Sequence, residues 1–308
     1  MRIVITGGSG YLAGRIIEKL LRCRDYEITA ISQEKSKLYL DTKINYFSWD
    51  QEDDIHNAIS NANIILHTSG FNALDAAKYP DKAKDFSRKS TKSIINSLNP
   101  ESATKLIFFS TAHVYKSHLI GEINEDTLTG NNHPYALSNL VGESITKELN
   151  LSGKKQGLIL RIGNCFGLPA NELSSCWDLA INGMCKSAIL NRQINIFGPS
   201  NEIRNFIPMR TFLEKLLLVI KDQSNGYPSE IINISYTKSY ALGEIAKLIS
   251  DRCFVLFNFT PKIICEQLKK DSLTLNYQSK YIETLPEEEN HFQEEIDETL
   301  IFLKNNHD

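Results

Sequence analysis

Residues 6–14 read TGGSGYLAG and directly follow the apolar run Arg2–Ile5. A short run rich in Ile and Val is typical of a buried parallel strand, and the pattern from Tyr11 to about Cys23 is that of a helix. A glycine-rich turn between a strand and a helix is the arrangement that binds the pyrophosphate of a dinucleotide. The alternative is a glycine-rich turn without a ligand, but its place after a strand and before a helix favours dinucleotide binding.

Each small residue of this turn has a physical role in that prediction. Gly7 can adopt the backbone angles of a tight turn, and Gly10 leaves room for a phosphate beside the backbone. Ala13 is small enough to let the helix lie close to the strand. The free N–H groups at the start of the helix, around Tyr11 and Leu12, would face the phosphates. We therefore expect these five residues to bind the cofactor.

The composition of the chain argues against several classes of protein. The chain has 308 residues, of which 42% are hydrophobic and 23% charged, with a net charge of −3. There is no basic block, so we expect no nucleic-acid partner. No apolar stretch approaches the roughly 20 residues of a membrane span, and no signal peptide is evident, so we expect a cytoplasmic protein without a membrane partner. The six cysteines form no CxxC pair, which predicts reduced thiols and no metal site.

Apolar strand-like runs alternate with helical patterns over the first half of the chain. This alternation predicts an α/β fold, a Rossmann-type doubly wound parallel sheet with helices on both faces. The expected strands are 2–5, 27–31, 44–47, 63–66, 105–109 and 158–160, and the expected helices are 11–23, 53–60, 80–98 and 134–151.

The remainder of the chain has a different pattern. We expect residues 1–165 to form the dinucleotide-binding domain and residues 166–308 a smaller C-terminal α/β substrate lobe, with the segment near 204–222 packing back on the first domain. The acidic run 284–298 predicts a solvent-exposed helix face. The other expected elements are helices at 175–186, 209–221 and 241–252 and strands at 194–197 and 231–234.

Several ordered motifs resemble those of the extended short-chain dehydrogenases/reductases, the NAD-dependent epimerase/dehydratase family that acts on nucleotide sugars. Members epimerise, dehydrate or reduce sugars linked to a nucleotide. The resemblance runs nearly end to end. The matching stretches are TGGSGYLAG at 6–14 (family TGxxGxxG), STAHVY at 110–115, PYALSN at 134–139 (PYxxSK), LRIGNCFG at 160–167 (LRxxNxYG) and RNFI at 204–207 (RDFI).

The resemblance assigns catalytic roles by position. Tyr135 corresponds to the family's acid/base, which also contacts the cofactor, and Thr111 to the hydroxyl that hydrogen-bonds the reacting oxygen. The family's lysine, four residues after the tyrosine, is Asn139 here. His113 lies where some relatives carry a second acid/base. The alternatives are a local backbone bond for Thr111 and a merely packed His113. The Asp-Glu pair of the family's dehydratases is absent at 112–113, which disfavours dehydration.

The missing lysine bears on the direction of the reaction. Free tyrosine has a pKa of about 10, so a nearby positive charge is needed before it can act as a base near neutral pH. Asn139 can hydrogen-bond a ribose hydroxyl but brings no charge. A protonated Tyr135 is nevertheless the form that reduction of a ketone requires. We therefore expect the substitution to impair oxidation more than reduction.

The end of the second strand helps to distinguish between NAD and NADP as the cofactor. NAD-binding proteins usually end it with an acid that binds the ribose 2′-hydroxyl. Here the strand ends near Ser32, and Glu34 comes later, beside Lys35. A hydroxyl and an ammonium group suit a 2′-phosphate, so NADP is slightly favoured over NAD. Asp50 resembles the family's adenine-contacting acid, or it could cap the following helix. Gly70 lies where the family's backbone passes the cofactor.

Asn164 and Arg204 are the expected substrate-binding residues, because the fork of an arginine suits a diphosphate. The favoured function is an NAD(P)-dependent enzyme that modifies a nucleotide sugar, as a 4-keto reductase or a 4-epimerase, in the synthesis of polysaccharide or glycoconjugate precursors. The alternative is a catalytically impaired protein that binds a dinucleotide or sugar nucleotide as a sensor or partner-binding module. The resemblance also implies a homodimer through a four-helix bundle of the helices at 80–98 and 134–151.

Overall fold

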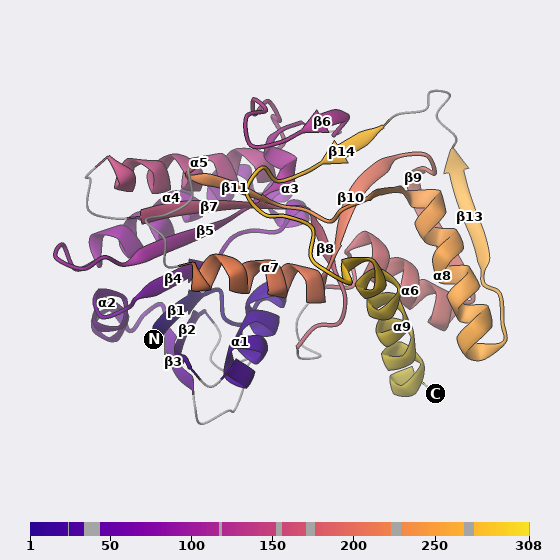
Figure 1. Ribbon diagram of the computed structural model, residues 1–308, viewed down its shortest axis with the longest axis horizontal. Helices are drawn as coiled ribbons and strands as arrows, with labels where there is room; N and C mark the ends of the chain where they lie inside the picture. The colour runs from indigo at the N-terminus through magenta and orange to yellow at the C-terminus, as the bar shows by residue number, and fades with distance from the viewer. Residues whose placement is uncertain are drawn as a thin grey trace.

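A seven-stranded parallel sheet forms the centre of the first lobe in the computed structural model (Figure 1). The structure describes residues 1–23, 25–33, 44–116, 119–151, 156–170, 176–222, 229–267 and 274–307. The strand order β11-β7-β5-β4-β1-β2-β3 confirms the predicted Rossmann-type fold. The strands are β1 (Arg2–Thr6), β2 (Glu27–Ser32), β3 (Ile44–Ser48), β4 (Ile64–His67), β5 (Lys105–Thr111), β7 (Gln156–Ile162) and β11 (Ile231–Ile234).

The central strands are short and apolar because both faces of the sheet are covered. One hydrophobic cluster includes Ile3 and Ile5, and a second includes Val4 between them, so alternate β1 side chains enter opposite layers. Parallel register places Thr6 beside His67, at the carboxyl ends of β1 and β4. The residues that follow these strands therefore meet at one edge of the sheet, which is where ligands bind in this architecture.

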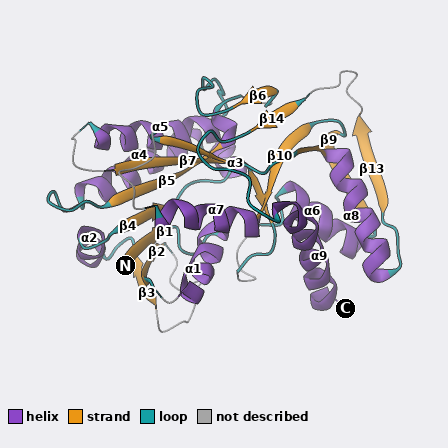
Figure 2. Ribbon diagram, in the orientation of Figure 1, coloured by secondary structure: helices purple, strands orange, loops and turns teal. Residues whose placement is uncertain are grey.

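Helices cover both faces of the sheet, and Figure 2 shows α4 and α5 on one side and α1 and α7 on the other. The helix α7 packs against α1, whereas the residues just before α7 belong to a small sheet of the second lobe, and the packing of the whole segment near 204–222 on the first domain stays a prediction. The short helix α3 has only six residues and was not predicted. The helices of this lobe are α1 (Tyr11–Cys23), α2 (Glu52–Ser60), α3 (Ala73–Lys78), α4 (Pro80–Asn96), α5 (Pro134–Asn150) and α7 (Met209–Lys221).

In the part of the chain that the structure describes, the second lobe consists of small sheets and the helices α6, α8 and α9. The three-stranded sheet β12-β10-β8 lies beside the carboxyl edge of the large sheet, and β9 pairs with β13 and β6 with β14. The strand β11 joins the large sheet although it lies beyond residue 165, and the domain boundary at 165 stays a prediction. The elements are β6 (Gly121–Ile123), β8 (Asn164–Phe166), β9 (Gln193–Pro199), β10 (Ile203–Pro208), β12 (Ser239–Ala241), β13 (Lys262–Gln267), β14 (Leu275–Tyr277), α6 (Ala180–Asn191), α8 (Leu242–Phe257) and α9 (Glu288–His307). None of the described helices could span a membrane.

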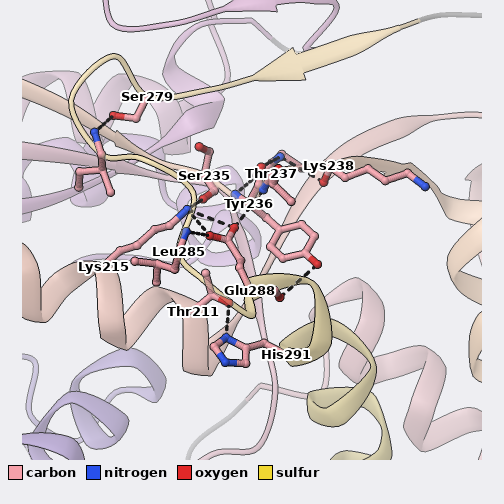
Figure 3. A network of polar contacts seen from close by, with 12 residues as sticks. Thr211, Lys215, Ser235, Tyr236, Thr237, Lys238, Ser279, Leu285, Glu288 and His291 are labelled. Carbon is pink, nitrogen blue, oxygen red and sulfur yellow. Dashed lines mark hydrogen bonds and ion pairs between the residues drawn. The ribbon is translucent and has the colours of Figure 1, made fainter.

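The acidic run 284–298 is not a uniformly exposed helix face, and that prediction was wrong for two of its glutamates. Glu288 and Glu295 on α9 are only 1% and 2% exposed. Glu288 can be buried because Lys215 Nζ lies 3.0 Å from its Oε2, while the backbone N–H of Thr237 donates to Oε1 and that of Leu285 to Oε2 (Figure 3). A buried charge that is paired and hydrogen-bonded avoids most of the cost of leaving water.

Glu295 is also buried, but it has fewer hydrogen-bond partners than Glu288. Its Oε2 accepts from the backbone N–H of Arg210 at 3.2 Å, and its Oε1 has no hydrogen-bond partner among the described residues. Burial, opposed by the Arg15 charge, raises the pKa of Glu295 to about 7. The proton is therefore held in the folded protein at a pH where an ordinary glutamate has lost it.

We expect this proton to make stability depend on pH. The unfolded carboxyl titrates near 4.5 and the folded one near 7, so the free energy of unfolding should fall by roughly 2–4 kcal/mol as the pH rises through that window. Glu295→Gln should flatten this slope, whereas Glu289→Gln, an exposed change on the same helix, should preserve it. Urea unfolding between pH 5 and 8 measures both, and an unchanged slope in Glu295→Gln would refute the assignment.

Candidate active site

A cavity of about 930 Å³ lies at the carboxyl edge of the large sheet and is closed on its other side by the second lobe. Among the described residues, nine separate stretches of the chain contribute to its lining. It brings together eleven of the residues that the sequence pointed to, namely Gly10, Tyr11, Leu12, Ala13, Gly70, Thr111, His113, Tyr135, Asn139, Asn164 and Arg204. Their roles in binding and catalysis stay predictions.

The glycine turn is built as its sequence requires. Gly7 has a φ of +74°, and a Cβ there would lie 3.1 Å from the backbone of Ser69, so a side chain would be strained and crowded. The N–H of Gly10 donates to the carbonyl of Gly7 at 2.8 Å, which closes the turn. Gly7 thus shapes the turn from outside the cavity, and the helix α1 begins at Tyr11 on the cavity wall. The N-terminus of α1 is suited to a pyrophosphate.

The predicted cofactor residues Ser32, Lys35 and Asp50 are not among the residues that line the cavity in the described part of the chain. Ser32 ends β2, and its Oγ donates to Ser9 Oγ of the glycine turn at 2.9 Å, while the next residue, Gln33, lines the cavity. Lys35 lies outside the described residues. Asp50 does not line the cavity, and Gln51 rather than Asp50 occupies the N-cap position of α2.

Tyr135 lies in the first turn of α5. This helix begins there because Pro134 suits the first helical position and the His133 side chain caps the N–H of Tyr135. Burial raises the pKa of the Tyr135 hydroxyl, and hydrogen bonds with Thr111 and Asn139 offset only part of that rise. The Asn139 Nδ2 donates to the carbonyl of Tyr135 at 2.8 Å. The phenol is therefore protonated at neutral pH, which suits a proton donor.

Thr111 and His113 lie on the turn that follows β5. The Thr111 Oγ1 accepts from the backbone N–H of His113 at 3.2 Å, so the local backbone bond exists, and Thr111 also lowers the pKa of the Tyr135 hydroxyl in part. The ring centroids of His113 and Tyr135 lie 6.5 Å apart. Burial, together with the Arg204 and His133 charges, lowers the pKa of His113, although its hydrogen bond with Asn164 opposes this. The imidazole is neutral near pH 7.

Where Arg204 lines the cavity, it forms an ion pair that the sequence did not predict. Both Arg204 Nε and Nη2 lie 2.8 Å from Glu202 Oε1, and both residues line the cavity. The sequence could have indicated this ion pair, because a glutamate stands two residues before the arginine. Among the described residues no cluster of side chains is suited to hold a metal ion.

A buried ion pair between Glu143 and Arg161 lies behind the site, and the sequence analysis missed it as well. Glu143 Oε2 accepts from Arg161 Nη2 at 2.6 Å, and its Oε1 accepts from Arg161 Nε at 2.9 Å and from Ser110 Oγ at 2.6 Å. Glu143 lies two helical turns beyond Tyr135 on α5, and Ser110 precedes Thr111 on β5. This network therefore fixes the helix that bears Tyr135 against the strand that bears Thr111.

These features define a Rossmann-type fold with a cavity at the carboxyl edge of its large sheet, lined by Tyr135 and Thr111. The chain belongs to the NAD dependent epimerase/dehydratase family, whose model matches residues 3–235.

Individual relatives agree with this assignment. The chain is 21% identical over 262 residues to the UDP-glucose 4-epimerase of Lactobacillus helveticus, covering 80% of this chain and 79% of that protein. A UDP-N-acetylglucosamine 4-epimerase structure from Methanobrevibacter ruminantium has a TM-score of 0.80 at 21% identity, covering 99% of this chain and 98% of that one. A UDP-glucuronic acid 4-epimerase of Bacillus cereus, in complex with UDP-glucuronic acid and NAD, has a TM-score of 0.78 at 16% identity, covering 98% and 100%.

Proposed function

We propose that this protein is an NAD(P)-dependent enzyme that reduces the 4-keto group of a nucleotide-linked sugar. The observation that carries this proposal is Tyr135, which lines the cavity beside Thr111 and whose pKa no cationic side chain lowers among the described residues. Among the described residues Arg204 is the only Lys or Arg that lines the cavity, and it is paired with Glu202. A tyrosine that stays protonated is suited to give a proton to a carbonyl oxygen and poorly suited to remove one.

The residues of the glycine turn fit a bound dinucleotide, because Gly7 allows the tight turn and Gly10 leaves the cavity wall without a side chain at the N-terminus of α1. The cofactor supplies a hydride donor when it is bound. Tyr135 gives its hydroxyl proton to the ketone oxygen, and Thr111 hydrogen-bonds the same oxygen. The Asn139 side chain, whose Nδ2 donates to the carbonyl of Tyr135, opposes part of the rise that burial causes in the pKa of the Tyr135 hydroxyl. The resulting alcohol remains linked to its nucleotide.

Two residues bear on which cofactor and which substrate the enzyme would bind. We favour NADP slightly over NAD, since Ser32 rather than an acid ends β2, although the Bacillus cereus structure holds NAD. Arg204, once released from Glu202, would bind the diphosphate of the nucleotide sugar. Such a reduction would supply precursors of polysaccharides or glycoconjugates. A homodimer through α4 and α5 and their symmetry copies belongs to the same proposal, since these two helices pack side by side.

Turnover with a panel of substrates tests this function. Purified protein with NADPH or NADH and a set of nucleotide-linked 4-keto sugars should show loss of the reduced cofactor's absorbance. Tight binding of dinucleotides and sugar nucleotides without turnover would instead favour the second candidate, a catalytically impaired binding protein. Asn139 is the observation that keeps this second candidate open. The 4-epimerase function requires oxidation as well as reduction at one site, and Asn139 weighs against the oxidative step.

Asn139→Lys should change the two directions unequally. A lysine ammonium near the Tyr135 hydroxyl would lower the pKa of that hydroxyl, so alcohol oxidation should rise by about ten-fold or more near neutral pH. Ketone reduction should change less, because its proton donor is already protonated. Initial rates in both directions from pH 6 to 10 measure the effect, with Asn139→Gln as the uncharged control. No gain in oxidation at any pH would count against this role of Asn139.

A further inference from the structure

Asn131 lies in the loop before α5 and is buried, with an exposed fraction of 6%. Its side-chain Nδ2 donates to the backbone carbonyl of His113 at 2.7 Å, and its Oδ1 accepts from the backbone N–H of His133 at 2.9 Å. Since a carbonyl can only accept and an N–H can only donate, these two partners fix which way the amide faces. Both ends of this side chain therefore join two backbone segments that are distant from each other in the chain.

The first of these segments is the turn that carries Thr111. His113 lies two residues after Thr111, where β5 has ended. The backbone N–H groups of Gly130 and Asn131 both donate to the carbonyl of Val114 on the same turn, at 3.2 and 3.4 Å. The loop that holds Asn131 is therefore attached to this turn by main-chain bonds as well as by the side chain.

The second segment is the start of the helix that carries Tyr135. His133 lies two residues before Tyr135, and its Nδ1 accepts from the backbone N–H of Tyr135 at 3.2 Å. One chain of hydrogen bonds thus runs from Asn131 through His133 to the backbone of Tyr135. The ion pair of Glu143 with Arg161 holds α5 two helical turns further on, so Asn131 connects α5 and the β5 turn at the end where Tyr135 lines the cavity.

We propose that Asn131 is a positioning residue for ketone reduction, because it sets the place of the Tyr135 hydroxyl relative to the Thr111 hydroxyl. The inference rests on the proposed function, in which Tyr135 gives a proton to the ketone oxygen and Thr111 hydrogen-bonds the same oxygen. A misplacement of about 1 Å can lower the rate of an enzymatic step by roughly 100-fold. Asn131 is not among the described residues that line the cavity, so its loss should lower kcat and leave KM nearly unchanged.

Asn131→Asp tests this role, because it replaces the amide NH₂ by an oxygen of similar size. The ionised carboxylate still accepts from the N–H of His133, but it has no proton to donate to the His113 carbonyl. At pH 8, kcat for reduction of a thymidine-diphosphate 4-keto-6-deoxy sugar should fall by about 10–100-fold, while KM for the sugar and Kd for NADPH or NADH change by less than about two-fold.

Acidification should restore the variant. A protonated carboxyl can donate to the His113 carbonyl and accept from the His133 N–H, as the asparagine does. Between pH 8 and pH 5.5, kcat of Asn131→Asp should therefore rise by about ten-fold relative to kcat of the wild type. Asn132→Asp, the same change at the exposed neighbouring residue, is the matched control and should follow the wild type at both pH values.

NMR of protein containing ¹³C-labelled tyrosine gives a second measurement that needs no turnover. The signal of the Tyr135 ring carbon that bears the hydroxyl is assigned by its loss in Tyr135→Phe. Its chemical shift reports on the surroundings of the hydroxyl, which include Thr111. In Asn131→Asp this signal should be displaced at pH 8 and should return to the wild-type position at pH 5.5.

The results distinguish the role of Asn131 from the proposed function. An unchanged kcat in Asn131→Asp at pH 8, or a loss that acidification does not reverse, would overturn the role and leave the reductase intact. A parallel loss of kcat and cofactor binding at both pH values would do the same, since it indicates general disruption. If the wild type reduces no keto-sugar, a displaced and returning Tyr135 signal would support the positioning and contradict the reductase, and an undisplaced signal would overturn both.

Discussion

Tyr135→Phe should lower the rate of ketone reduction by about 10²–10⁴-fold, the usual contribution of a positioned acid or base. The change removes one oxygen and keeps the ring, so α5 and the cavity wall should be preserved. The Tyr135 hydroxyl interacts with Thr111 and Asn139, and neither can replace it as the proton donor, because amide protons and alcohols are weaker acids than a phenol. Binding of the dinucleotide should persist, since Gly7 and Gly10 shape its site.

Steady-state kinetics with a nucleotide-linked 4-keto sugar measure this effect, and a thermal shift with NADPH or NADH checks that the variant still binds. Tyr79→Phe, on a half-exposed tyrosine outside the cavity, is the matched control and should react as wild type. A Tyr135→Phe variant with an undiminished rate would show that the proton comes from another group.

Lys215→Met should lower the free energy of unfolding by about 3–5 kcal/mol, because it leaves the Glu288 carboxylate buried without its counter-charge. Lys215 Nζ also donates to the carbonyl of Ser235 at 2.6 Å, so the ammonium connects α7, α9 and the loop after β11 (Figure 3). Glu288 in turn accepts from the backbone N–H groups of Thr237 and Leu285. One cation thus holds the start of the C-terminal helix in place.

Two further variants test whether the loss of stability in Lys215→Met comes from burial of the Lys215–Glu288 ion pair. The double variant Lys215→Met with Glu288→Leu should recover part of the loss, since it removes both charges. Lys247→Met breaks an ion pair with Asp251 whose side chains are 74% and 61% exposed, and should cost less than about 1 kcal/mol. Chemical unfolding followed by circular dichroism gives the three values. Equal losses from Lys215→Met and Lys247→Met would contradict this view of the network.

The sequence predicts the first lobe well because its signals are local. The apolar run before the glycine turn, the turn itself and the proline before Tyr135 each depend on neighbours in the chain, and the structure has β1, α1 and α5 at those places. The convergence of Thr111 and Tyr135 also follows, since parallel strands bring their carboxyl ends to one edge. The resemblance to a family adds the expected roles, and these remain to be tested.

The long-range pairs could not be predicted in this way. Glu288 and Glu295 lie in an acidic run that ordinarily indicates a solvated surface, and their burial depends on partners from α7, with Lys215 73 residues away. Glu143 and Arg161 were missed for the same reason, because neither residue's own neighbourhood shows that they meet behind the site. The return of β11 to the large sheet is likewise decided by the tertiary fold.

The most direct test of the reductase is transfer of label from cofactor to sugar. Reduced cofactor that carries deuterium at C4 of its nicotinamide is mixed with the protein and a nucleotide-linked 4-keto sugar, and the product is examined by NMR. We predict one deuterium at the former ketone carbon of the sugar, with one equivalent of cofactor oxidised for each product formed. Tight binding of both ligands without transfer of deuterium would contradict the proposed reductase and favour a binding protein.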